Sequence, residues 1–525
     1  MKIDPVTLAV MNNRLAAIAE EMGVVLGMTG YSPNIKERHD FSCALFDARG
    51  ELVAQAAHIP VHLGSTPLSV RAAIERLELD PGDVAALNDP FAGGTHLPDL
   101  TLVAPIFIGD EKRPFGYAAN RAHHADIGGM APGSMGLATE IYQEGFRLPP
   151  VKIVEAGALS RDVMTLFLAN TRVHEEREGD LRAQIAALSV GSDRLRALVD
   201  TSGRATIAAA MDGLKTYSAR LMEAELRKIK AGTYAAEDFL DDDGFGAERI
   251  PIRVKIRIAG GRAIVDFAGS SPQVRGNVNA NYAITLSATF YVMKCIASEE
   301  VPANEGLMRP IKVLAPAGSI VNANPPAAVA GGNVETSQRI VDVLFKALAP
   351  AGPDRIAAAS SGSMSNLTIG GFDRFRNRHF SYYETIAGGA GASREHAGTS
   401  GIHTHMTNTL NTPIEALETY YPMRINEYRI RRGSGGHGAS GGGDGLIREL
   451  ECLVESSVSL LTDRRTIHPW GLNGGGEGAL GANFLVHDHV RRKLPGKTSV
   501  RLAPGDSIRI ETPGGGGWGR TKKSK

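Results

Sequence analysis

The sequence is poor in cysteine, in net charge and in long apolar runs, and each shortage excludes a class of protein. Three cysteines in 525 residues cannot build a disulfide scaffold, so we predict a reducing, cytoplasmic location. The 57 Lys and Arg residues balance the 57 Asp and Glu residues, which gives no electrostatic argument for nucleic acid or a membrane surface as partner. No apolar run approaches the roughly 18 residues of a transmembrane helix, and early Asp4 and Pro5 are unlike a secretory signal.

What the sequence contains is a series of differently patterned regions. Apolar residues at steps of three and four predict a helix over residues 5–28, with Asp4 as its N-cap. Short apolar runs between turn residues predict strands in residues 30–155, and residues 160–231 carry helical stripes. Strict alternation from Ile250 to Ile258 predicts a sheet that is buried on one face only. Residues 360–519 are glycine-rich and predict mostly strand and loop.

These patterns together predict an α+β, mixed multi-domain chain. We expect an N-terminal helix with a short-strand metal-site region, a helical middle, and a β-rich, glycine-rich C-terminal region. The predicted divisions are an N-terminal domain of residues 1–235, a β-rich domain with helical insertions of residues 236–519, and a basic tail of residues 520–525.

Histidines gather in the first quarter of the chain, with six of the 15 between His39 and His124. The stretch "GGTHLPD" places His96 and Asp99 three residues apart on a loop that its glycines and proline should fix. The stretch "RAHHADIGG" adds His123, His124 and Asp126. The predicted strands "LTLVAPIFI" and "FGYAANRAHH" would bring the two clusters together if they pair.

Two imidazoles and one carboxylate suit a catalytic metal site, because they leave coordination positions open. Neighbouring residues on a strand face opposite ways, so only one of His123 and His124 can reach the ion. We predict His96, Asp99 and His123 as ligands of a divalent metal, Mn²⁺ or Zn²⁺, with His124 as the alternative to His123. His124 and Asp126 are then predicted catalytic residues.

A third cluster precedes an apolar run in "SPNIKERHDFSCALFD". It is either a solvated charged turn or the mouth of a pocket, and in the second case Lys36, Arg38 and His39 are catalytic candidates. Lys36 and Arg38 could bind a carboxylate or phosphate. His58 and His62 follow at positions from which they could support metal ligands.

The glycine-rich "RRGSGGHGASGGGDG" raises the question of a nucleotide site. It has no Gly-Lys-Ser/Thr, and a predicted strand rather than a helix follows it, so neither a P-loop nor a dinucleotide fingerprint fits. We predict tight backbone packing there and no cofactor-binding residues.

Several long stretches, taken in order, resemble the hydantoinase B/oxoprolinase family. They include "NDPFAGGTHLPD", "RAHHADIGGMAPGSM", "GGNVETSQRI", "HMTNTLNTPIEALE" and "ETPGGGGWG", and the resemblance covers nearly the whole chain. One departure is Gly441, which stands before "GGDG" where the family pattern leads us to expect an arginine.

The resemblance implies a subunit of an ATP-dependent cyclic-amide hydrolase of the hydantoinase or 5-oxoprolinase type. A hydantoinase A-type ATPase partner would phosphorylate the small-molecule substrate, and this chain would open the ring by metal-assisted attack of water. ATP would be bound by that partner and not here, in a hetero-oligomer. Carboxylase relatives bind a metal through a His-x-x-Asp and a downstream His, which maps onto His96, Asp99 and His123 or His124. The alternatives are an acetone/acetophenone-type carboxylase subunit and a non-catalytic scaffold for the A-type partner.

Overall fold

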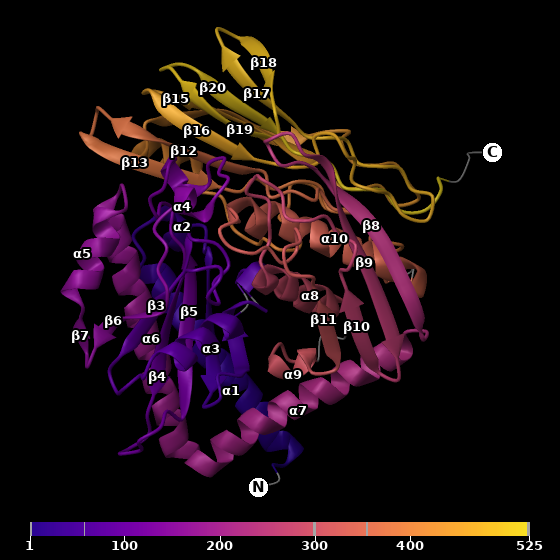
Figure 1. Ribbon diagram of the computed structural model, residues 1–525. Coiled ribbons are helices and arrows are strands. Elements are labelled where there is room, and N and C mark those ends of the chain that lie inside the picture. The colour runs from indigo at the N-terminus through magenta and orange to yellow at the C-terminus, as the bar shows by residue number, and fades with distance from the viewer. Residues whose placement is uncertain (1–2, 57, 63, 298–300, 353–354, 522–525) are drawn as a thin grey trace.

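A computed structural model describes residues 3–56, 58–62, 64–297, 301–352 and 355–521. It shows two helix-covered sheets side by side, with a pair of further sheets across one end (Figure 1). The predicted mixed α+β, multi-domain class is therefore confirmed. Within the described residues, no helix combines the length and the apolar character needed to cross a bilayer.

The first sheet has seven strands, and helices cover both of its faces. Helices α1 (Pro5–Thr29) and α6 (His174–Ser202) pack on one face and α3 (Thr66–Arg76) on the other. Both faces are thus buried, so every residue of β1, β4 and β5 is buried and these strands do not alternate between apolar and exposed polar residues. The strand order is β2-β1-β5-β4-β3-β6-β7, with bounds β1 (Phe41–Asp47), β2 (Leu52–Ala56), β3 (Val84–Leu87), β4 (Asp99–Ile106), β5 (Gly116–His123), β6 (Val151–Glu155) and β7 (Ala158–Leu159).

Shorter elements complete this region. They are α2 (Pro33–Lys36), the 3₁₀ turns η1 (Pro60–His62) and η2 (Pro132–Ser134), α4 (Ile141–Glu144) and α5 (Arg161–Ala169). The predicted N-cap of α1 is confirmed, because the Asp4 side chain accepts hydrogen bonds from the amides of Val6 and Thr7.

The long helix α7 (Arg204–Lys228) runs below both sheets and leads from the first to the second (Figure 1). The second sheet has the order β11-β10-β9-β8, with β8 (Gly232–Asp242), β9 (Glu248–Ala259), β10 (Arg262–Asp266) and β11 (Ile311–Leu314). Helices α8 (Tyr282–Ile296) and α10 (Ser337–Leu348) share its core. The predicted alternation along β9 is confirmed, since Ile252, Val254 and Ile256 are buried and Arg253 and Lys255 are exposed.

The remaining elements of this part are short: α9 (Glu305–Met308), the π-helix η3 (Gly332–Thr336) and the turn η4 (Ala349–Ala351). Strand β8 runs through residues 235 and 236, where the sequence places a domain boundary. That division stays a prediction, as does the basic tail, whose residues 522–525 lie outside the described part of the chain.

The C-terminal part is a pair of sheets around one apolar core. Their strand orders are β13-β12-β16-β19 and β14-β15-β20-β17-β18. The bounds are β12 (Asn366–Asp373), β13 (Arg378–Glu384), α11 (Ile414–Tyr420), β14 (Met423–Arg431), β15 (Gly445–Cys452), β16 (Ser456–Leu461), β17 (Ala482–His487), β18 (Val490–Leu494), β19 (Lys497–Leu502) and β20 (Ser507–Glu511).

Five segments, four of them rich in glycine, form a layer without regular strands beside these sheets; we call it the glycine layer. It comprises residues 358–363, 388–400, 433–444, 470–481 and 513–519. Gly515 donates its amide hydrogen to Gly443 O at 2.9 Å, and Gly517 donates to Gly476 O at 2.8 Å. A Cβ on Gly515 would lie 2.0 Å from Ala390 O, so only glycine permits this approach. The predicted tight backbone packing is confirmed.

Candidate metal site

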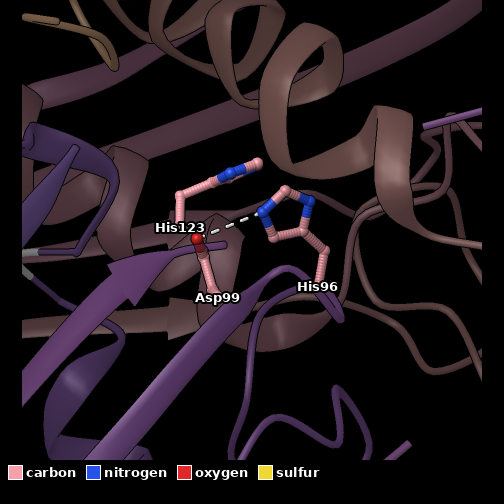
Figure 2. Close-up of side chains that lie close together, drawn as sticks. All are labelled: His96, Asp99 and His123. Carbon is pink, nitrogen blue, oxygen red and sulfur yellow. Dashed lines mark ion pairs between the residues drawn. The ribbon is translucent and has the colours of Figure 1, made fainter. Parts of the chain in front are cut away.

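The candidate site lies where β4 begins and β5 ends. These strands are antiparallel, and their register places Asp99, the first residue of β4, directly opposite His123, the last residue of β5. His96 precedes β4 by one turn, which the Asp99 amide closes by donating to His96 O at 3.1 Å. A tight turn and a strand pair therefore carry three residues from two sequence motifs to one point, as Figure 2 shows.

The three side chains point toward one another in the interior. His96 Nε2 lies 3.2 Å from Asp99 Oδ1, and one ligand atom from each residue falls within 4.8 Å of the others. At most 2% of any of the three side chains is exposed. Among the described residues, no other group of three His, Cys, Asp or Glu side chains is as close.

The loop that carries His96 is held from the second half of the chain. Asn281, the N-cap of α8, donates side-chain hydrogen bonds to the carbonyls of Pro90, Gly94 and Thr95 at 2.8–3.0 Å. A Cβ on Gly94 would lie 2.5 Å from Asn88 O, so this glycine lets the loop fold closely against its own start. The position of His96 thus depends on contacts between distant parts of the sequence.

Polar groups around the cluster orient its members. The Asn34 amide lies 3.2 Å from His123 Nδ1, the Thr95 hydroxyl donates to Asp99 Oδ2 at 2.7 Å, and the Asn333 amide lies 3.1 Å from His96 Nε2. The ring of Tyr383 stacks on that of His123 at 4.5 Å between centroids. With its Nδ1 engaged by Asn34, His123 has Nε2 buried without a hydrogen-bond partner.

His62 lies beside the cluster, which agrees with its predicted supporting position. Its Nε2 is 3.6 Å from Asp99 Oδ2, and its Nδ1 is 2.9 Å from the Ser42 hydroxyl. Burial alone would raise the pKa of Asp99, but the imidazoles of His96 and His62 hold that pKa well below its usual value. Burial, with His96 nearby, lowers the pKa of His123 well below its usual value.

A cavity of about 20 Å³ opens beside the cluster, which is room for one water molecule. Asp99, His123, Asn333 and Tyr383 line it, together with Asp40. Burial raises the pKa of Asp40 to about 7, against the lowering effect of Arg38.

Asn333 and Tyr383 were missed by sequence reasoning, and Asp40 was recognised only as a member of the third cluster and not as a site residue. Asp40 stands in "KERHDF" and Asn333 in "GGNVETSQRI", so a close reading of the family motifs could have found both. Tyr383 carries no sequence signal.

The residues of the third cluster separate in the structure. Lys36 and His39 are exposed, and His39 adopts a positive φ of 54° at a turn. Arg38 is buried and donates to Asn34 Oδ1 at 3.1 Å, which in turn supports His123. Of the three, the structure brings only Arg38 close to the cluster.

His124 and Asp126 also lie apart from it. His124 faces α6, where its Nε2 is 3.0 Å from Gln184 Oε1. Asp126 accepts hydrogen bonds from the amides of Gly128 and Gly133 and pairs with Arg172 at 2.9 Å, so it fixes the loop after β5. A catalytic role for either residue stays a prediction without a contact to the cavity.

Comparison with known proteins places this geometry in a family. The family model for hydantoinase B/oxoprolinase matches residues 4–521. The chain belongs to the hydantoinase B/oxoprolinase family. An uncharacterized protein of Methanocaldococcus jannaschii is 43% identical and aligns over 98% of this chain and 91% of its own length. A putative D-/L-hydantoinase component from Pseudomonas sp. strain NS671 is 33% identical, over 99% and 90%.

Other family members are longer than this chain. 5-Oxoprolinase 1 of Arabidopsis thaliana is 39% identical over 98% of this chain, which spans 42% of the plant protein.

The crystal structure of an ATP-dependent caprolactamase from Pseudomonas jessenii superposes with a TM-score of 0.92 at 32% identity, covering 99% of this chain and 92% of that one. An acetone carboxylase shares the fold, with a TM-score of 0.91 at 19% identity over 98% and 76%. Family membership supports an enzymatic role.

Proposed function

We propose that this chain is the ring-opening subunit of an ATP-dependent cyclic-amide hydrolase. In this proposal a hydantoinase A-type partner phosphorylates the substrate, and the site at His96, Asp99 and His123 receives the activated ring. The observation that supports it best is the convergence of these three buried side chains, of which Asp99 and His123 line a small cavity. Relatives named as a 5-oxoprolinase, a hydantoinase component and a caprolactamase support the class of substrate.

The donor set fits a divalent cation. Two imidazole nitrogens and a carboxylate oxygen, without a thiolate, suit Mn²⁺ or Zn²⁺ and leave positions open for a ligand. His123 Nε2 has no hydrogen-bond partner, and its lone pair is free to coordinate a cation. When bound, such an ion polarises a carbonyl or phosphoryl oxygen and lowers the pKa of water.

The protein's own residues perform the other tasks. Asn34 and the stacked Tyr383 fix the ring of His123, so that Nε2 keeps its direction. Thr95 and His62 position the Asp99 carboxylate. Asp40, whose carboxyl lines the cavity, is available to the cation or to a proton in transit during ring opening.

The test is reconstitution with the A-type partner. We expect ATP hydrolysis that depends on a hydantoin, 5-oxoproline or a lactam, and stoichiometric ring opening in the wild-type complex. H96A and D99A should lose both bound metal, measured by elemental analysis, and ring opening. Either variant with full metal content and full activity would overturn the metal site.

Two further outcomes point to the alternatives. Turnover of a ketone that needs bicarbonate would assign the chain to the carboxylases. A complex that assembles, hydrolyses ATP and opens the ring equally well with H96A would make this chain a scaffold.

A further inference from the structure

Arg38 is a buried guanidinium without a carboxylate at ion-pair distance among the described residues. Its donors go instead to neutral groups: Leu410 O at 3.2 Å, Asn34 Oδ1 at 3.1 Å, Thr385 Oγ1 at 3.2 Å and Tyr383 O. A buried charge is ordinarily paired, because removing it from water is costly. Arg38 therefore places a positive charge without a direct ion pair immediately behind the cavity wall.

Three threonines line the cavity near this charge, and one of them, Thr385, accepts a hydrogen bond from Arg38. Thr385, Thr407 and Thr409 are each more than nine-tenths buried, and all three line the cavity. The hydroxyl oxygens of Thr385 and Thr409 are 2.7 Å apart, and those of Thr407 and Thr409 are 3.5 Å apart.

The three threonine hydroxyls have more hydrogens than acceptors. The three hydroxyls carry three hydrogens, but only two contacts join them, and Arg38 can donate but not accept. At least one O–H therefore has no acceptor among the described residues. A wall of hydroxyl donors with a cation behind it suits an acceptor-only, negatively charged ligand, since hydrogen bonds to ionised oxygens are the stronger ones.

We propose that Thr385, Thr407 and Thr409, with Arg38 behind them, bind the anionic oxygens of the phosphoryl group on the activated substrate. This inference rests on the proposed function, because it assigns that phosphoryl group to one wall of the same cavity. The threonines touch the ligand, and Arg38 is a positioning residue that acts through Thr385.

Two of the three hydroxyls belong to residues 403–412, which form neither helix nor strand. This segment is anchored by the Leu410 amide on Arg38 O at 3.1 Å and by the Asn411 side chain on Thr385 O at 2.9 Å. A cavity of about 20 Å³ is too small for a phosphoryl group. Entry therefore requires part of the wall to move, and this segment, which is neither helix nor strand, is the part of the wall that we expect to move.

The first experiment measures binding of inorganic phosphate to the full chain loaded with Mn²⁺. T385V and T409V keep the side-chain shape but remove the hydroxyl, and we expect each to weaken phosphate binding about tenfold or more. T385S and T409S should restore it. T201V is the matched control, because Thr201 is exposed on α6 and bonds only its own helix. Folded T385V and T409V proteins with wild-type phosphate affinity would overturn the proposal.

The second experiment distinguishes bound substrate from released product, using the complex with the A-type partner. We expect T409V to release phosphate from ATP with less ring opening per phosphate, and T409S to recover the wild-type ratio. Weaker phosphate binding with an unchanged ratio would mean that the threonines hold only released phosphate, which overturns the assignment to the activated substrate. If the wild-type complex opens no cyclic amide, the proposed function fails, whereas the binding experiment still decides whether the anion subsite exists.

Discussion

Two adjacent histidines at the end of β5 have different surroundings. His123 and His124 are neighbours in sequence, yet the strand points them to opposite faces of the sheet. His123 meets Asp99 and the cavity, whereas His124 meets Gln184 on α6. The Gln184 amide also donates to Leu100 O and Asn120 Oδ1 at 3.0 Å, so His124 belongs to a network that joins helix and sheet.

The two histidines should therefore differ in their effect on metal binding. We expect H123A to lower the metal content of the purified chain at least tenfold, because it removes one of three ligands. H124Q should keep the metal and lose at most about 2 kcal/mol of stability through its network. Elemental analysis with a denaturation curve for each variant checks this. Loss of metal in H124Q but not in H123A would exchange the roles of the two residues.

The meeting of Asp99 and His123 follows from the register of one strand pair, and for that reason it could be predicted. A tight turn brings His96 near them, although its loop is also held by Asn281 from the second half of the chain. Asn333 and Tyr383 reach the same cavity from far along the chain, through the packing of whole units that no local pattern encodes. Lys36, His39 and Asp126 were predicted to be catalytic because they are polar. Polarity alone does not distinguish a catalytic group from a residue on an exposed turn or from a carboxylate that fixes a loop.

At the scale of elements, the glycine layer replaces side-chain packing with contacts between backbones. Gly441 and Gly442 are adjacent, but they differ in their surroundings. A Cβ on Gly442 would lie 2.0 Å from Gly515 O, whereas a Cβ on Gly441 would approach nothing closer than 3.8 Å. Neither has a positive φ, so space alone separates them.

This pair gives a matched test of the layer. G442A should destabilise the chain by about 3 kcal/mol, because the backbones must separate. G441A should change stability by less than about 1 kcal/mol and could raise it by restricting the unfolded chain. Urea denaturation of both variants measures the difference. Equal stabilities would show that the layer separates at little cost.

Helix α4 is tied to the second half of the chain through one carboxyl group. Glu144 is buried and accepts hydrogen bonds from the amides of Val329 and Ala330 at 2.9 and 2.8 Å. Burial raises the pKa of Glu144 to about 8, despite these two donors. Its second oxygen has no partner, which suits a protonated carboxyl.

The raised pKa makes this contact sensitive to alkali. Between the usual carboxyl pKa of 4.5 and about 8, the unfolded chain has lost the proton and the folded chain keeps it. Stability is therefore full at acid pH and falls as pH rises through this window, by at most ~5 kcal/mol. E144Q retains the acceptor and cannot titrate, so its stability relative to wild type should rise across the window. Urea denaturation at several pH values measures the unfolding free energy of both proteins. If the wild-type and E144Q free energies change in parallel with pH, Glu144 is not the titrating group.

At the scale of the whole molecule, a buried ionic network joins the second sheet to the C-terminal sheets. Arg464, after β16, bonds Asp238 on β8 at 2.8 Å and Asp342 on α10 at 2.6 Å. Arg339 also pairs with Asp342 at 2.8 Å. All four side chains are almost completely buried.

Removing Arg464 should leave two buried carboxylates, Asp238 and Asp342, to share the single cation of Arg339. We expect R464M, which keeps most of the side-chain volume, to cost about 3 kcal/mol or more. R194M removes the exposed pair between Arg194 and Glu21, and should cost at most about 0.5 kcal/mol. Denaturation midpoints compare the two variants, and similar losses would show that the network adds little to cohesion.

Individual helices and strands could be predicted from the sequence where the periodicity of apolar residues is strong. Helix α1 with its Asp4 cap and the alternating strand β9 match their predicted patterns. The order of strands within each sheet was not predictable, because strands such as β12 and β16 pair across long intervening segments. The same holds for the clamp of Asn281 on the loop of His96.

The glycine layer also sets a schedule for biosynthesis. Its central segment, residues 513–519, is translated after the other four, and Gly516 alone joins two of them through Ala359 and Ala392. Until that segment is synthesised, the earlier four segments lack part of their backbone partners, including the partners of Ala359 and Ala392. The layer is therefore completed after its other four segments, and its unmatched backbone groups are exposed to other chains until then.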